Sequence, residues 1–416
     1  MSSIKRNKFK IGLVVCIVVI LFSSCSFGQK IVTLHIACDG GANIAPFEWM
    51  KDEIETENPV KIVLHPLPYE EVYSKLKAEF VAQTGAYDIV VFFPKFLGDF
   101  VVNGYLLPLD ELNKRLPVKM DDVLLPVREF YCKAEGKLYA LPYDGDILAM
   151  WYRKDLFNHP AEKEAFKEKY GYELRPPETW DEWLDVAEFF TRKKGEKLAG
   201  ETLKENFYGC ATYGQRDFMY AWWFNRYASM GGSYFDENMN PMINTPKAVK
   251  ALQNWIDSLK YAPPEVLTYG FDELQATFIE GRCAMEINWT DVGRVGSDPR
   301  VSKVVGKIGV ALVPGTRLPD GRVIHRPVMA GSRVMAITKT CKYPELAFEV
   351  LRMMALDASL AYVSSTYSGM DPFRYSHFAT PEAFGMFANY EEAKAYLDGI
   401  KANLQVGYPE LTMQGS

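Results

Sequence analysis

A short, almost uninterrupted apolar run at residues 87–93 (YDIVVFF) is the feature that most restricts how this chain can fold. Such runs are typical of strands that are buried on both faces, as in a parallel sheet. Two more strands are predicted before it, at residues 31–37 and 61–67, and a helical pattern lies between each consecutive pair of strands. This strand–helix–strand order predicts an α/β fold with a mainly parallel sheet.

Polar and aromatic residues follow the ends of the first and third of these strands. Asp39 and Asn43 come after the first strand, and the third ends at Phe93, two residues before Lys95. Ligands bind beyond the carboxyl ends of strands in open α/β sheets, so these four residues are candidate ligand contacts. Simpler structural explanations stay open: Asp39 can stabilise a turn, Phe93 can cap the sheet, and Lys95 can be a solvated loop residue.

The segment 136–157 (GKLYALPYDGDILAMWYRKDLF) contains two further predicted strands, separated by a proline and an Asp-Gly-Asp sequence. Spacing alone favours a β-hairpin with a solvated acidic tip at Asp144 and Asp146. In the alternative interpretation, the two strands meet at a hinge and both carboxylates face a ligand. The local pattern leaves both open, because only the rest of the chain determines whether the two strands pair.

The remainder of the chain continues the alternation of helices and strands. Thr179, followed three residues later by Glu182, forms a capping box that predicts the start of a helix. Trp222 and Trp223 lie in a predicted helix at 218–230; only one of them can face a cleft, and we select Trp222. Trp289 directly follows a predicted strand at 283–288 and precedes Asp291. Other predicted helices span residues 245–260, 271–280 and 344–356, and other predicted strands span 307–313 and 333–338.

Length and composition limit the class of protein. A chain of 416 residues is longer than a usual single compact domain, so we expect two domains or lobes. The content of 48% hydrophobic and 24% charged residues is that of a soluble globular protein. A formal net charge of −6 without a basic stripe argues against nucleic-acid binding, which depends on neutralising phosphates.

The N-terminus has the pattern of an export signal. Basic residues up to Lys10 precede an apolar run at residues 11–22 and two serines. The run is short for a membrane span, which needs roughly 20 apolar residues. Cys25 ends the sequence Phe-Ser-Ser-Cys, which resembles the lipobox of bacterial lipoproteins. We therefore expect a signal peptide over 1–24, lipidation of Cys25 and a tether over 25–30, with plain secretion as the alternative.

Motifs of common enzyme classes are missing from the sequence. It contains no Walker loop, no Gly-x-Gly-x-x-Gly at a helix start and no Gly-x-Ser-x-Gly elbow. The five histidines lack the spacing of metal ligands, and the five cysteines after Cys25 include no Cys-x-x-Cys pair. We expect no catalytic residue, metal or cofactor. A glycosidase pair drawn from Asp144, Asp146 and Asp291 stays open, because a sequence does not give the separation between carboxylates.

Five blocks, taken in order, resemble a known family. They are GKLYALPYDGDILAMWYRKDLF, PPETWDEWLDVAEF, NTPKAVKALQNWIDSLKYAPPEV, FIEGRCAMEINWTD and GKIGVALVPG. The set resembles the family-one extracellular solute-binding proteins of ABC importers, which include maltose-binding protein and sugar- and polyol-binding lipoproteins. Each block alone is a weak signal, but the ordered set is specific and covers nearly the whole chain from residue 31.

The resemblance implies an α/β, two-lobed type II periplasmic-binding-protein fold with hinge-connected lobes and a ligand cleft between them. Lobe 1 would comprise residues 31–141 and 331–376, and lobe 2 residues 142–330 and 377–416. The chain would first cross between the lobes at residues 141–146 and return near 328–338. In this context the hinge interpretation of Asp144 and Asp146 is preferred to the hairpin.

The implied function is the capture of a carbohydrate or polyol for an ABC permease, outside the cytoplasm, by a monomer that a lipid anchor holds to a bacterial membrane. Sugars present apolar faces that stack on aromatic rings and hydroxyls that bind charged side chains. A carbohydrate-active secreted enzyme and a surface lipoprotein for adhesion or signalling are the alternatives. The candidate ligand contacts are Asp39, Asn43, Phe93, Lys95, Tyr143, Asp144, Asp146, Trp222, Trp289, Asp291 and Arg333.

Two features depart from the family pattern. Members often read Gly-Gly-Trp-Gly near the second crossing, whereas this chain has Ala330-Gly331-Ser332-Arg333. Arg333 would replace the tryptophan platform by a bidentate polar contact, which suggests a different or more polar ligand. The final helices of the family's second lobe are expected to be missing, because the sequence ends at Ser416.

Overall fold

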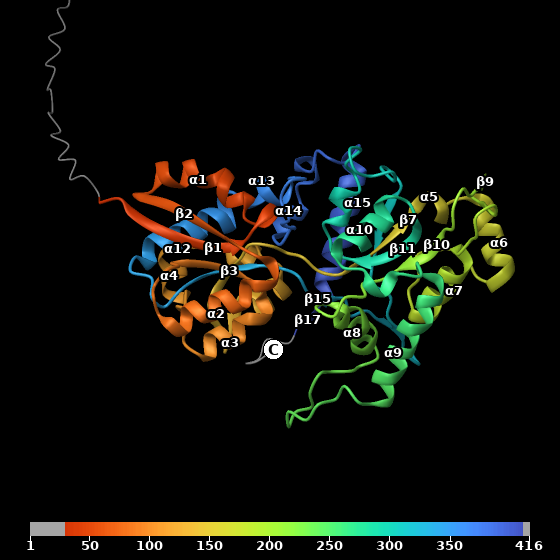
Figure 1. Ribbon diagram of the computed structural model, residues 1–416, viewed down its shortest axis with the longest axis horizontal. Coiled ribbons are helices and arrows are strands. Elements are labelled where there is room, and N and C mark those ends of the chain that lie inside the picture. Colours follow the sequence, from red (N-terminus) through yellow and green to blue (C-terminus); the bar gives the residue numbers. More distant parts are fainter. Residues whose placement is uncertain (1–29, 411–416) are drawn as a thin grey trace, which may run out of the picture.

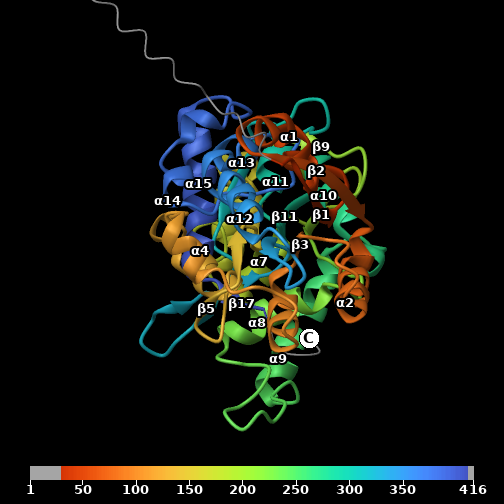
Figure 2. The ribbon, with the colours of Figure 1, turned by 90° about the vertical axis from the view of Figure 1, so that its left-hand side faces the viewer.

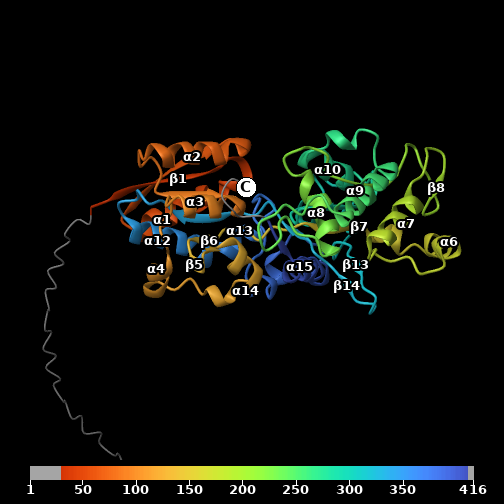
Figure 3. The ribbon, with the colours of Figure 1, turned by 90° about the horizontal axis from the view of Figure 1, so that it is seen from below.

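The protein has two lobes that lie side by side, each with a central sheet and helices packed on it (Figure 1). The structure is a computed structural model and describes residues 30–410. The predicted signal peptide, Cys25 and most of the predicted tether lie outside the described residues. Figure 2 looks onto the first lobe from its outer end, and Figure 3 shows both lobes from below, joined at the middle.

The first sheet has the strand order β2-β1-β3-β16-β6. β1 runs parallel to β2 and β3, while β16 runs antiparallel to both β3 and β6. These strands are β1 (Val32–Asp39), β2 (Val60–Leu67), β3 (Ile89–Phe92), β6 (Ala140–Pro142) and β16 (Val334–Ile337). The parallel, fully buried β3 agrees with the apolar run from which it is predicted.

Helices α1 (Ala45–Glu57) and α2 (Val72–Ala82) connect the parallel strands of the first sheet. α1 lies above this sheet and α2 below it in Figure 1. Phe47 and Ile54 of α1 are fully buried, because their spacing places them on the side of the helix that faces the strands. The alternation of strands and helices therefore produces a sheet covered on both faces, as predicted.

The second sheet has the order β10-β11-β7-β12, in which β10 and β11 are parallel and β7 is antiparallel to both of its neighbours. The Thr179 hydroxyl accepts the N–H of Glu182, so the predicted helix start is confirmed. The strands are β7 (Ala149–Arg153), β10 (Tyr208–Ala211), β11 (Cys283–Asn288) and β12 (Ile308–Ala311). The main helices of this lobe are α7 (Trp180–Phe190), α8 (Met219–Ser229), α9 (Pro246–Ser258), α10 (Phe271–Ile279) and α15 (Tyr390–Gln405).

The segment between β6 and β7 crosses from one lobe to the other. β6 belongs to the first sheet and β7 to the second, so the two strands do not pair as a hairpin. Asp144 is fully buried and Asp146 is only 7% exposed, so the solvated acidic tip that spacing favours is wrong. The reason is tertiary, because the pairing partners of both strands lie more than a hundred residues further along the chain.

The chain changes lobe twice more. Residues 330–333 link the short strand β15 (Val328–Met329), which follows the second sheet, to β16 in the first. A third connection leads from α13 (Ser359–Val363), beside the first sheet, to α15, which packs on β12 of the second. After α15, β17 (Tyr408–Pro409) pairs in parallel with β15.

Smaller elements complete the lobes. The short helices are α3 (Leu97–Val102), α4 (Asp110–Arg115), α5 (Lys154–Phe157), α6 (Pro160–Tyr170), α11 (Val292–Val295), α12 (Pro344–Arg352) and α14 (Tyr375–Phe378). The two-residue strands are β4 (Lys133–Ala134), β5 (Lys137–Leu138), β8 (Lys197–Leu198), β9 (Glu201–Thr202), β13 (Thr316–Arg317) and β14 (Val323–Ile324).

Within residues 30–410, no helix combines the length and the apolar character that a membrane span requires. The same part of the chain has no cluster of His, Cys, Asp or Glu side chains arranged to hold a metal ion. The five cysteines in this range, at positions 38, 132, 210, 283 and 341, are all free thiols.

A substitution at Gly145 can test the contact between the first and third crossings. A Cβ atom at this position would stand 2.1 Å from the carbonyl oxygen of Pro372. We expect Gly145→Ala to lower the free energy of unfolding by at least about 1–3 kcal/mol, because the obstacle is backbone and yields little. Urea denaturation measures the change. Gly385→Ala is the matched control, since a Cβ there meets nothing within 4 Å; equal midpoints for both variants would show that the crossings do not touch.

Candidate functional site

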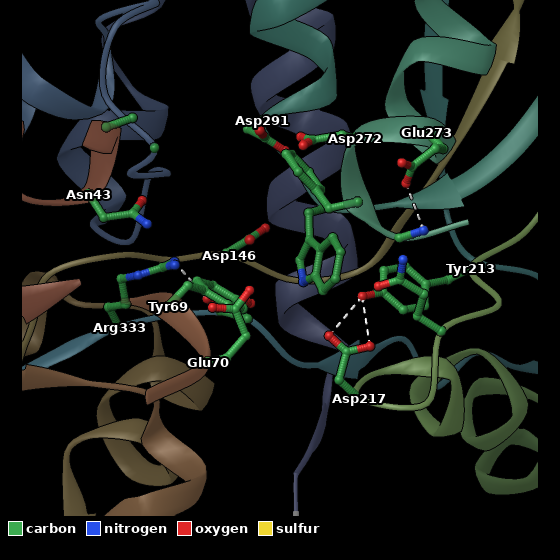
Figure 4. Close-up of a pocket in the computed structure, with 17 residues that line it drawn as sticks. Asn43, Tyr69, Glu70, Asp146, Tyr213, Asp217, Asp272, Glu273, Asp291 and Arg333 are labelled. Atoms are coloured by element: carbon green, nitrogen blue, oxygen red, sulfur yellow. Dashed lines mark hydrogen bonds between the residues drawn. The ribbon is translucent and has the colours of Figure 1, made fainter. Parts of the chain in front are cut away.

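A cavity of about 470 Å³ lies between the two lobes, with a volume typical of small-molecule sites. Both lobes and all three crossings contribute to its wall. Figure 4 shows the lining residues as sticks. The lining residues are Ala42, Asn43, Tyr69, Glu70, Asp146, Tyr213, Gln215, Asp217, Gly270, Phe271, Asp272, Glu273, Trp289, Asp291, Gly331, Arg333 and Gly369.

Arg333, at the start of β16, forms the first-lobe wall. Its Nε donates to the two carboxylate oxygens of Asp39 at 3.1 and 3.0 Å, and its Nη2 donates to Oδ2 at 2.8 Å. Its Nη1 donates to the Gly331 carbonyl at 2.9 Å and lies 3.5 Å from Oδ2 of Asp144. Because Asp39 ends β1 and Asp144 lies in the first crossing, the guanidinium joins three segments that are distant in sequence.

Aromatic rings support the same guanidinium. Its central carbon lies 4.9 Å from the ring centre of Phe93 and 5.8 Å from that of Tyr69, within the range of cation–π attraction. Phe93 is 4% exposed, so it supports Arg333 from behind, whereas Tyr69 lies at the cavity surface. The ring of Phe93 therefore fixes the plane of the arginine without forming part of the wall.

Asp146 is the carboxylate of the first crossing that reaches the cavity. Its Oδ1 accepts the backbone N–H groups of Ile147 at 2.8 Å and Thr290 at 2.9 Å, and the Thr290 hydroxyl at 2.7 Å. No donor among residues 30–410 bonds to its Oδ2. Burial, together with the nearby charge of Asp371, raises the pKa of Asp146 well above its usual value.

Trp289, after β11, provides the aromatic wall of the second lobe. Its Nε1 donates to the carbonyl of Ala330 at 2.8 Å in the second crossing. The next residue, Gly331, has φ of +92°, and a Cβ atom there would lie 2.2 Å from Nε1 of Trp289. Glycine is therefore required at 331 for two reasons, its backbone conformation and the close approach of the indole.

A cluster of rings packs around Trp289. The ring centres of Tyr213, Phe218 and Trp222 lie 5.7, 5.4 and 5.2 Å from that of Trp289, each in an edge-to-face arrangement. Trp222 is 1% exposed and donates to the carbonyl of Ile287 at 2.8 Å. Trp222 therefore supports the wall from behind and is not part of the cavity surface.

Asp291 is a second carboxylate on the cavity wall. Its Oδ2 accepts from Nε2 of Gln275 at 3.3 Å, while its Oδ1 is buried without a hydrogen-bond partner among the described residues. Burial, followed by the negative charge of Asp371, raises the pKa of Asp291 to about 7. Asp371 itself is bound by the buried guanidinium of Arg294, with Nη2 at 3.1 Å from Oδ1.

The structure gathers the eleven predicted ligand contacts in one region but brings only five of them to the cavity surface. Those five are Asn43, Asp146, Trp289, Asp291 and Arg333. The other six do not line the cavity and form a supporting layer behind it, which corrects the expectation that they face the cleft. Asp39 and Asp144 bind Arg333, and Phe93 packs behind its guanidinium. Trp222 packs behind Trp289, the Tyr143 hydroxyl donates to the Asn43 carbonyl, and Lys95 lies over the ring of Phe218.

Several lining residues are missing from the sequence prediction. Tyr69 follows the end of β2 and Tyr213 follows the end of β10. The rule that selects Asp39 and Phe93 from the carboxyl ends of strands would also have selected these two tyrosines. Phe271, at the start of α10, carries no distinguishing pattern in the sequence, because its position depends on how the helix is placed in the second lobe.

A family model described as bacterial extracellular solute-binding protein matches residues 41–360, most of the chain. The chain belongs to this family. Among its relatives, a probable ABC transporter-binding protein of Deinococcus radiodurans is 28% identical over 78% of this chain and 72% of its own length. A mannitol-binding protein of Pseudomonas aeruginosa is 27% identical over 69% of this chain and 61% of its own length.

Solved structures of other solute-binding proteins have the same fold. One from Agrobacterium vitis with bound D-mannitol aligns with a TM-score of 0.66 at 25% identity, over 90% of this chain and 84% of its own. One from Agrobacterium radiobacter in complex with ribitol aligns with a TM-score of 0.68 at 22% identity, over 90% and 98%. The predicted type II periplasmic-binding fold is therefore confirmed, and the family is one of binding proteins that act outside the cytoplasm.

The contribution of Arg333 can be measured by Arg333→Met, which removes the charge and keeps an unbranched side chain. Asp39 and Asp144 would then be buried without this cation, so we expect the free energy of unfolding to fall by about 3–5 kcal/mol. Chemical denaturation measures the loss. The matched control Arg322→Met removes only an exposed ion pair with Asp320 and should leave the midpoint nearly unchanged. A loss for Arg333→Met as small as that of the control would contradict this description.

Asp291 should make the protein less stable as the pH rises. Its native pKa of about 7 exceeds the unfolded value of about 3.9, so between these pH values the folded state binds more protons and its stability falls with increasing pH. We expect Asp291→Asn to raise the melting temperature at pH 8 and to give no such gain near pH 4. Asp257→Asn is the control. The hydrogen bond from Lys260 lowers the pKa of Asp257, so this variant should lower the melting temperature at pH 8 where Asp291→Asn raises it. Thermal unfolding across this pH range decides; an Asp291→Asn gain that does not change with pH would refute the assignment.

Proposed function

We propose that this solute-binding protein captures a sugar or sugar alcohol in the interlobe cavity and presents it to an ABC importer. The observation that carries the proposal is the make-up of the cavity wall, in which the Trp289 ring adjoins the carboxylates of Asp146 and Asp291. An aromatic face beside fixed carboxylates matches a molecule that has apolar C–H surfaces and hydroxyl groups.

The two kinds of contact have different roles in this proposal. Stacking on Trp289 would contribute about 0.5–1.5 kcal/mol beyond the burial of apolar area, and would accept a range of polyhydroxylated compounds. Hydrogen bonds between ligand hydroxyls and the carboxyl groups of Asp146 and Asp291 are directional, so they would determine which compound binds well. The D-mannitol and ribitol of the related structures belong to this class of compound and support it.

Closure of the lobes around the ligand is part of the proposal. The crossing segments contact one another: the N–H of Gly145 donates to the Asp371 carbonyl at 3.0 Å, and the N–H of Asp144 donates to the Arg333 carbonyl at 3.1 Å. Motion at these few positions would rotate one lobe on the other, as in hinge closure. A ligand that contacts both lobes would shift the balance toward the closed form by as much as it prefers that form.

The remaining parts of the proposal concern transport. The protein would be exported by its N-terminal signal and attached to the bacterial membrane through lipidated Cys25, acting as a monomer in the periplasm or at the cell surface. An ABC permease would recognise the closed form. No reaction is expected at the cavity, so the bound compound should be recovered unchanged.

A thermal-shift screen of the purified protein against sugars and sugar alcohols tests the proposal. A ligand that binds only the folded state raises the melting temperature in a concentration-dependent way. At a free ligand concentration of about a hundred times Kd, the free energy of unfolding increases by about 2.7 kcal/mol. We expect mannitol, ribitol or a related compound to give this response. Hydrolysis of a glycoside would favour the carbohydrate-active enzyme instead, and no response to any compound would favour an adhesion or signalling role.

The aromatic wall can be tested by removing its central ring. Trp289→Ala should weaken binding of the responsive compound at least several-fold, because the stacking face is lost. Trp49→Ala is the matched control, since Trp49 is 47% exposed on α1 and does not line the cavity. Isothermal titration calorimetry measures both; an unchanged Kd in Trp289→Ala would exclude this ring from the site.

A further inference from the structure

Hydrogen-bond donors on the cavity wall are largely bound by the protein itself. Arg333 gives its N–H groups to Asp39, Asp144 and the Gly331 carbonyl. The indole N–H of Trp289 is bound to the Ala330 carbonyl at 2.8 Å. Tyr213 donates to Asp217 at 2.9 Å. The Asn43 and Gln215 amides each give one N–H to the protein, to Asp39 and to the Thr268 carbonyl. The wall therefore offers a ligand few donors, namely the second N–H of these two amides and the Tyr69 hydroxyl.

Acceptors on the same wall, in contrast, have few hydrogen-bond partners within the protein. Asp146 is more than nine-tenths buried, yet its Oδ2 has no donor among residues 30–410. Oδ1 of Asp291 is buried and also lacks a partner in the described part of the chain. Oδ2 of Asp146 is not among the fully buried polar atoms, so it is open to the cavity and free to accept from a ligand. Asp291 lines the same cavity, and a carboxylate in such a site with few donors is costly, so a ligand that brings N–H donors would be stabilised there.

The charge around these atoms is unbalanced. Among the lining residues Arg333 is the one basic side chain, against six acidic ones, all labelled in Figure 4. The positive charge of Arg333 is already paired with Asp39, and the buried guanidinium of Arg294 is paired with Asp371. No cation of the described residues is paired with Asp146 or Asp291.

We infer that the ligand is a polyhydroxylated amine, such as an amino sugar or an amino polyol, whose ammonium group binds between Asp146 and Asp291. The inference rests on the proposed function and narrows its substrate class. An ammonium has three N–H donors, no acceptor and a positive charge, whereas a hydroxyl has one donor and needs donors in return. The donor-poor, acceptor-rich and negatively charged wall matches the ammonium.

Matched pairs of compounds test the inference, because each pair differs only in the replacement of one hydroxyl by an amine. Glucose with glucosamine and sorbitol with glucamine are suitable probes for calorimetry with the purified protein at neutral pH. We expect the amine of at least one pair to bind about tenfold more tightly than its hydroxyl partner, which corresponds to about 1.4 kcal/mol. This preference should weaken at high ionic strength less than a surface interaction would, since the site is buried.

Charge-removing variants locate the ammonium. Asp146→Asn and Asp291→Asn should each abolish most of the preference for the amine and leave weaker binding of the hydroxyl compound. Asp291→Asn is the safer of the two for folding, because its carboxylate has a single side-chain contact, from Gln275. Asp257→Asn makes the same chemical change on α9, outside the cavity, and should keep the full preference.

The outcomes separate this inference from the proposed function. If the hydroxyl member of each pair binds as tightly as the amine, the inference is overturned and the sugar-binding function stands. If the amine preference survives unchanged in both aspartate variants, the proposed position of the ammonium is wrong. If neither member of any pair binds and the wider screen of sugars and polyols also fails, both proposals fall together.

Discussion

A buried guanidinium joins the first lobe to the segments that connect it with the second. A charge removed from water requires partners of opposite sign, and Arg333, which is 6% exposed, finds them in Asp39 at the end of β1 and Asp144 in the first crossing. Asp144 in turn accepts the N–H of Asp371 at 2.8 Å in the third crossing. Because one ionic network reaches all three connections, they form a single packed unit and not three independent linkers.

This network divides the site residues into two layers with different roles. In the inner layer both arginines have acidic partners: Asp39 pairs with Arg333, and Asp371 pairs with Arg294. The cavity surface, in contrast, presents carboxylate oxygens with few hydrogen-bond partners and an aromatic face. Position in the cavity, and not residue type alone, therefore determines which of the aspartates is available to a ligand.

The α/β order and most element positions could be predicted from the sequence, because buried parallel strands appear as apolar runs and helix starts carry local caps. Which candidate residues reach the cavity could not be predicted. Asp39 is the last residue of β1 and Asn43 follows it closely, yet only Asn43 lines the cavity, since Asp39 is bound by an arginine 294 residues away. The same limit explains the hairpin error, because strand partners are set by tertiary contacts and not by local spacing.

The hydrogen bond between Trp289 and the Ala330 carbonyl has a consequence for how the protein can be observed. The indole belongs to the second lobe, while the carbonyl belongs to the connection that leads to the first, with Gly331 packed against the ring. Rotation about this connection would alter the surroundings of the indole even before any ligand touches it. The ring is thus an intrinsic fluorophore whose environment would change with the angle between the lobes, so that the proposed opening and closing could be followed without an attached label.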